Sequence, residues 1–102
     1  MALFVLTHRA GPAWDVAVPF PEQRDIIAHI GFMHGLDEAG RLVLGGPYDE
    51  PMPGEPVGMA IIEAEDAKAA WALARTDPSL DLGLLTVDVR PWRPRMGKAL
   101  NA

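Results

Sequence analysis

The chain has 102 residues, of which 49% are hydrophobic and 23% charged, which suits one folded domain and excludes the composition of a disordered chain. The formal net charge of −5 at pH 7 argues against nucleic acid as a partner, because such binding depends on Lys and Arg at phosphates. The lack of cysteine excludes disulfides, thiolate catalysis and cysteine-based metal sites, and it favours a reducing, cytoplasmic compartment.

The first predicted element is a strand over residues 2–8 that is apolar on both faces. Its apolar run ends at His8 and Arg9, too soon for a signal peptide, and no later run is long enough to cross a membrane. We expect His8 to face solvent or a dimer partner. A proline-rich loop follows that is too long for a tight turn.

The second predicted element is a helix over residues 21–39, with acidic Glu22 near its start and Gly40 at its end. Apolar residues recur along it at helical spacing: Ile26, Ile30, Met33 and Leu36. His29 lies three residues after the first of these, so it is expected to point with them toward the sheet.

The remaining predicted elements are strands at residues 41–47 and 57–63, a helix at residues 66–75 and a last strand at residues 84–90. The first of these strands ends at Gly45-Gly46-Pro47, where glycine allows unusual backbone shapes and proline stops pairing. The helix ends at Asp77-Pro78, because the residue before proline is driven out of the helical region. Residues 93–102 are expected to form the tail of a single domain, 1–102.

This order of elements predicts an α+β fold of ferredoxin-like βαββαβ topology, with an antiparallel sheet and two helices on one face. The strands at 2–8 and 57–63, which are apolar on both faces, are the central ones in that topology. Because the helices cover only one face, the other face needs a cover, and a second copy of the chain is the simplest supplier. We therefore predict a homodimer through the open sheet face.

His29 is the first candidate for chemistry. Partial burial and a neighbouring carboxylate let histidine act as a general acid or base near neutral pH. A buried histidine satisfied by one hydrogen bond fits the same spacing, so both interpretations stay open. His34 lies on a different side of the helix, and the chain has neither cysteine nor a cofactor-binding glycine motif, so we predict no metal site and no cofactor.

Asp77 and the Gly45-Gly46-Pro47 bend are further candidates. Asp77 either shapes the Asp-Pro turn alone or, if the fold brings the two together, accepts a hydrogen bond from the ring of His29. The bend either ends its strand or lets backbone amides border a pocket for a carbonyl or anionic group.

A set of motifs spans nearly the whole chain: Arg24 to His29, Gly40-Arg41-Leu42, Gly45-Gly46-Pro47, Gly58, Asp77-Pro78 and Val89-Arg90-Pro91-Trp92. Their spacing resembles the YCII-related (YciI-like) family of dimeric α+β barrel proteins. The resemblance implies a ferredoxin-like dimer and an active-site pair formed by His29 and Asp77. For some relatives it also implies dehydrochlorinase-type chemistry on a chlorinated, hydroxylated ring.

The sequence departs from this family pattern at two positions. Met59 stands where a small hydroxyl residue is common, and Ser79 stands where an aromatic residue often follows Asp-Pro. We expect both to line the substrate pocket together with Gly46 and Pro47. Compared with the family pattern, the pocket then lacks a hydrogen-bond donor at Met59 and an aromatic ring in its wall at Ser79.

These features predict a small homodimeric enzyme that uses His29 and Asp77 for general acid–base chemistry, either proton abstraction or elimination, on a small ring or carbonyl compound. The alternative is a non-catalytic dimer that binds a small ligand or another protein, in which His29 is structural. The distance between the two side chains and the presence of a cavity beside them discriminate between the two hypotheses.

Overall fold

The computed structural model describes residues 1–101, so residue 102 of the predicted domain lies outside the described residues. Four strands form one antiparallel sheet in the order β2–β3–β1–β4, which confirms that the first and third strands are central. The elements in chain order are β1 (Ala2–Ala10), α1 (Ile26–Glu38), β2 (Leu42–Pro47), β3 (Gly58–Ala64), α2 (Ala67–Ala74), α3 (Pro78–Asp81) and β4 (Leu85–Trp92). The predicted ferredoxin-like α+β fold, the type found in dimeric α+β barrels, is confirmed.

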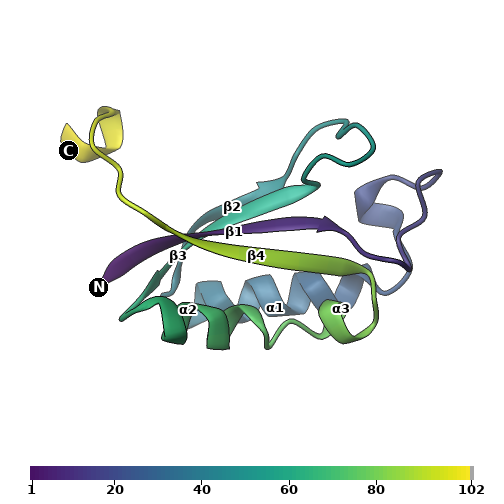
Figure 1. The fold of residues 1–102 in the computed structure, drawn as a ribbon, viewed down its shortest axis with the longest axis horizontal. Coiled ribbons are helices and arrows are strands. Elements are labelled where there is room, and N and C mark those ends of the chain that lie inside the picture. The colour runs from purple at the N-terminus through teal and green to yellow at the C-terminus, as the bar shows by residue number, and fades with distance from the viewer. Residues whose placement is uncertain (102) are drawn as a thin grey trace.

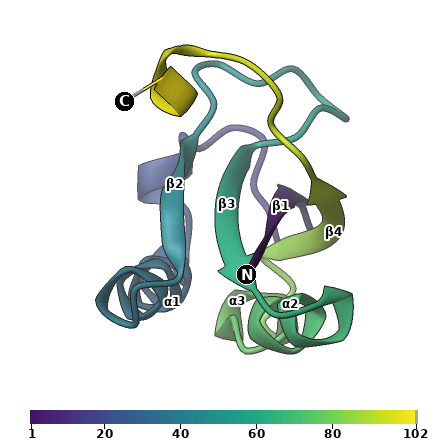
Figure 2. The same cartoon turned by 90° about the vertical axis from the view of Figure 1, so that its left-hand side faces the viewer.

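Helices α1, α2 and α3 lie on one face of the sheet (Figure 1). Viewed along the sheet, α1 lies beneath β2, while α2 and α3 lie beside it under the rest of the sheet (Figure 2). The core fills the space between the layers, where alternate residues of the central strands meet small residues of α2; it includes Phe4, Leu6, Ala60, Ile62, Ala70 and Ala74. None of the helices in the described part of the chain has the length and apolar character that a membrane crossing requires.

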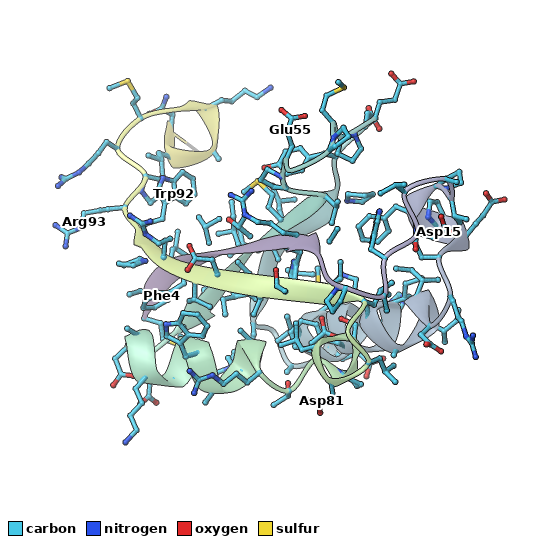
Figure 3. All side chains as sticks on the ribbon, turned by 45° about the vertical axis from the view of Figure 1, so that its right-hand side comes forward. Phe4, Asp15, Glu55, Asp81, Trp92 and Arg93 are labelled. Atoms are coloured by element: carbon cyan, nitrogen blue, oxygen red, sulfur yellow. The ribbon has the colours of Figure 1, made fainter. Side chains whose placement is uncertain are left out.

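The opposite face of the sheet, which we call the open face, carries Leu3, Val5, Leu44, Ile61 and Trp92. Val5 pairs with Ile61 at its centre, and Leu3 pairs with Trp92 at one end. Figure 3 shows Phe4 on the helix side of the sheet and Trp92 on the other side. Leu44 is 70% exposed and Trp92 46% exposed, so this face presents apolar side chains to its surroundings.

The prediction that the first helix begins near residue 21 is wrong. Phe20–Glu22 form one turn of 3-10 helix, and Asp25 then takes the left-handed conformation, with φ of 66°, so α1 begins at Ile26. The predicted apolar stripe also shifts, because Ile30 is 38% exposed. The buried side of α1 consists of Ile26, His29, Phe32 and Leu36.

His8 is buried, with 2% of its surface exposed, so the prediction that it faces solvent or a dimer partner is wrong. The cause is the alternation of side chains along β1, in which Phe4, Leu6 and His8 all point toward the helices. β1 continues for two residues beyond its predicted end at residue 8.

Candidate functional site

His29 and Asp77 meet beneath the sheet. His29 reaches the interior from the buried side of α1, and Asp77 is the N-cap residue of α3. The distance from His29 Nδ1 to Asp77 Oδ2 is 2.6 Å, the length of a short charge-assisted hydrogen bond. Both residues are buried, at 7% and 1% exposure. The structure thus contains the His–Asp pair that the sequence motifs indicated.

Asp77 is held in place by the start of α3. Its Oδ1 accepts a hydrogen bond from the backbone N–H of Ser79 at 2.9 Å, which leaves Oδ2 for His29. Burial alone raises the pKa of Asp77, but hydrogen bonds from the His29 ring and the Ser79 amide outweigh it, so the pKa is lowered from the usual value. Asp77 is therefore a carboxylate near neutral pH.

This charge fixes the form of the His29 ring. A carboxylate only accepts hydrogen bonds, so Nδ1 of His29 carries the proton that points at Asp77. In the neutral ring, Nε2 is then the nitrogen with a free lone pair, and it is the atom that can take a proton from a ligand. When it does so, the negative charge of Asp77 stabilises the imidazolium that forms.

A cavity of about 270 Å³ lies beside the pair. Its walls come from the segment before α1, from α1 itself and from the facing ends of β2 and β3; they include Phe20, Ile26, His29, Met33, Gly46 and Pro47. The walls are mainly apolar, and the volume is near the lower end for small-molecule sites. A ligand of about one ring in size fits such a space.

The four residues expected around the pocket occupy two different places. Gly46, Pro47 and Met59 line the same cavity as His29. A side chain at Gly46 would meet no atom within 4 Å, whereas a Cβ at the neighbouring Gly45 would collide with the end of the Met33 side chain, which lines the cavity. Ser79 is fully buried at the start of α3, where its amide holds Asp77. Its position makes it a support for the pair, behind the cavity wall.

Two residues at the site were not among the predicted site residues: His8, which was expected to face solvent or a dimer partner, and Phe20. The ring of His8 lies 4.8 Å from that of His29 between centroids, nearly perpendicular to it, and Phe20 lies 6.1 Å from His29. Both residues line the cavity. The alternation of the first strand carried the signal for His8, because it places residue 8 on the same face as Phe4 and Leu6.

His8, His29 and Asp77 have ligand-type atoms within 4.8 Å of one another, so their fit to a metal ion can be judged from geometry. Two ligands of one tetrahedral zinc ion, each at roughly 2.0–2.1 Å from it, lie about 3.3 Å apart. The 2.6 Å between His29 and Asp77 is shorter and matches a shared proton. These two atoms therefore share a hydrogen bond and do not both bind one ion.

Comparison with known proteins identifies the family. The model of the YCII-related domain matches residues 2–93. The chain belongs to the YCII-related family. No curated protein matches this YCII-related chain in sequence.

A solved structure of similar fold is 5-chloro-2-hydroxyhydroquinone dehydrochlorinase from Burkholderia phenoliruptrix AC1100, in complex with 2,5-dihydroxybenzoquinone. Its sequence is 22% identical, and the match covers 95% of the YCII-related chain and 97% of the dehydrochlorinase with a TM-score of 0.62. At this identity the likeness establishes a common fold.

Proposed function

We propose that this protein is an acid–base enzyme that moves protons on a small hydroxylated ring or carbonyl compound. The observation that carries the proposal is the buried 2.6 Å contact between His29 and Asp77 beside a cavity of single-ring size. His29 serves as general base and acid, and Asp77 orients the ring and stabilises its charged form. Gly46, Pro47 and Met59 border the substrate, and Ser79 supports Asp77.

The chemistry named for the structural relative suggests a specific reaction, the loss of HCl from a chlorinated hydroxyhydroquinone. His29 removes a proton from a ring hydroxyl, and the carbon that carries chlorine gains a proton. Chloride then leaves with the electrons of its bond as a second hydroxyl loses its proton. The products are a hydroxybenzoquinone and HCl, so the step consists of proton transfers and needs no oxidant.

A homodimer is part of the proposal. The open face presents Val5, Ile61 and Leu44 on the side of the sheet away from the helices. A second copy that packs the same face against it buries these side chains and closes the two sheets into a barrel. The His29–Asp77 pair lies on the helix side, so each copy holds its own site.

The test is release of chloride from 5-chloro-2-hydroxyhydroquinone by the wild-type protein and by His29→Asn. We expect the wild type to release chloride and His29→Asn to be slower by about 100-fold or more, since a positioned general base contributes at least that factor. Equal rates in the two proteins would remove the catalytic role of His29, and rates no faster than in buffer would favour the non-catalytic binding module.

A further inference from the structure

His8 occupies a rigid position in the site. It lies near the end of β1, paired with Gly58 of β3 on one side and with Val87 of β4 on the other. Its backbone carbonyl also accepts a hydrogen bond from Val57 N at 2.8 Å. The ring faces the helices and lines the cavity at a centroid distance of 4.8 Å from the ring of His29. Strand pairing therefore fixes the position of the His8 ring beside the His29 ring, which α1 contributes, and both rings line the same cavity.

The ring of His8 forms no hydrogen bond with any described residue, and one of its nitrogens is buried. The Nε2 atom is buried, and no described residue forms a hydrogen bond with it. Burial, and then the nearby His29, lower the pKa of His8 to about 4, so the ring is neutral at pH 7 and offers one donor and one acceptor. Buried polar atoms normally find a partner, and one without a protein partner points to a ligand or water.

The other walls of the cavity offer a ligand few polar side chains. Phe20, Ile26 and Met33 are apolar, and the remaining histidine at the cavity, His34, is exposed at its edge. His29 is the proton acceptor in the proposed chemistry, so its free nitrogen faces the reacting group. An oxygen atom of a ligand inside this cavity thus has His8 as its available side-chain partner.

We propose that His8 is the ligand-recognition residue of this site and hydrogen-bonds a hydroxyl oxygen of a ring substrate, or the oxyanion formed from it, holding it against His29. This inference rests on the proposed function of the same site. Either nitrogen of a neutral imidazole can be the donor, depending on the tautomer, and a half-turn of the ring exchanges nitrogen and carbon positions without changing its outline, so the ring can meet a ligand oxygen without repacking of the strand. A neutral donor also stabilises a developing oxyanion without taking the proton that His29 must carry.

The test compares two ring compounds of similar size, 2,5-dihydroxybenzoquinone and 2,5-dimethylbenzoquinone, in binding to wild type and to His8→Leu. Leucine retains the bulk of the side chain but removes both nitrogens. We expect His8→Leu to bind the dihydroxy compound about tenfold more weakly, as for the loss of one hydrogen bond, and the dimethyl compound unchanged. A purely structural role would change both affinities alike, and that result would overturn the inference. Failure of the wild type to bind the dihydroxy compound would overturn it too.

Leu6→Val is the matched control, because Leu6 lies on the same face of β1 but outside the cavity. It is expected to leave the ratio of the two affinities unchanged. The ¹⁵N signals of His8 in the wild type give a readout that does not depend on a folded variant. They should shift when 2,5-dihydroxybenzoquinone is added, and unchanged signals would contradict the role.

These outcomes are separate from those of the catalytic test. If the wild type releases no chloride but its affinity for the dihydroxy compound depends on His8, the proposed function is refuted and the recognition role of His8 is supported. If chloride release is lost in His29→Asn while His8→Leu keeps wild-type affinities and wild-type kcat/KM, the proposed function is supported and the recognition role of His8 is refuted.

Discussion

Asp77 performs two tasks with its two oxygens. One oxygen caps α3 through the amide of Ser79, and the other accepts the hydrogen bond from His29. The cap fixes the carboxylate relative to the helix, so the direction of the His29 ring follows from local backbone geometry. The motif spacing was enough to predict both members of the pair. His8 was missed because the strand was predicted to end there, which assigned it to the surface.

Replacement of Asp77 by Asn tests the interaction of Asp77 with His29 separately from its capping of α3. Asn also caps helices well but carries no charge to stabilise the imidazolium, so we expect Asp77→Asn to lower chloride release by about 100-fold or more. Asp66→Asn is the matched control, because Asp66 caps α2 through Ala69 N at 2.8 Å. The control should retain wild-type turnover. An active Asp77→Asn protein would show that the charge is dispensable.

The buried His8 predicts a dependence of stability on pH. Its pKa is lowered from 6.5 to about 4 in the folded state, chiefly by burial. The unfolded chain therefore binds the proton more tightly, and this group destabilises the fold as the pH falls from 6.5 toward 4, with no effect above that range. Between pH 7 and pH 5 we expect it to remove about 2 kcal/mol from the free energy of unfolding.

Urea denaturation of wild type and His8→Leu at the two pH values measures this effect. The variant should lose less stability on acidification than the wild type, because it has no imidazole to protonate at this position. An equal loss in both proteins would mean that His8 is protonated as easily in the folded as in the unfolded chain.

At the level of elements, alternation predicted the strands to within two residues, whereas the start of the first helix was misplaced. Pro19 and Pro21 confine the chain to a 3-10 turn, and the left-handed Asp25 separates that turn from α1. Apolar spacing also could not select the buried side of α1, because Ile27 is apolar and 75% exposed, and Ile30 is apolar and lies at the cavity with 38% of its surface exposed. Packing of α1 against the sheet determines which of its side chains are buried.

Replacement of glycine by alanine is expected to have opposite effects on stability at two positions, Gly11 and Gly31. A Cβ at Gly11 would collide with the backbone carbonyl oxygen of Gly83, where β1 leaves the sheet beside β4. We expect Gly11→Ala to lower the free energy of unfolding by about 1–3 kcal/mol. Gly31→Ala, in α1, meets no atom within 4 Å and should raise it by about 0.5–1 kcal/mol. Urea denaturation distinguishes them, and a Gly11→Ala protein as stable as the wild type would contradict the packing account.

For the whole molecule, the order of elements predicted the topology, and the two strands that are apolar on both faces are the central ones, as that topology requires. The same pattern predicted an uncovered apolar face, and the open face with Val5, Ile61 and Leu44 matches it. The cavity was not predictable in shape, since its walls come from segments that only the tertiary fold brings together. They include Phe20 before α1 and Pro47 at the end of β2.

The proposed homodimer is tested by a charge placed at the centre of the open face. We expect wild type to be a dimer at micromolar concentration and Ile61→Glu to be a monomer, because its carboxylate would be buried without a partner. Ile27→Glu is the control, since Ile27 is 75% exposed on α1, away from the open face. Light scattering after size exclusion gives the masses. A monomeric wild type would refute the dimer.

The central claim is that His29 and Asp77 move protons on a ring compound, and uptake of solvent deuterium at the carbon that loses chloride tests it most directly. 5-Chloro-2-hydroxyhydroquinone is incubated in D₂O with wild type, His29→Asn or Asp77→Asn, and deuterium in the hydroxybenzoquinone formed is measured by mass spectrometry. We predict faster formation of product with one ring deuterium in the presence of wild type than without protein, and loss of that acceleration in both variants. Formation of this product at the same rate with all three proteins and in buffer would contradict the claim.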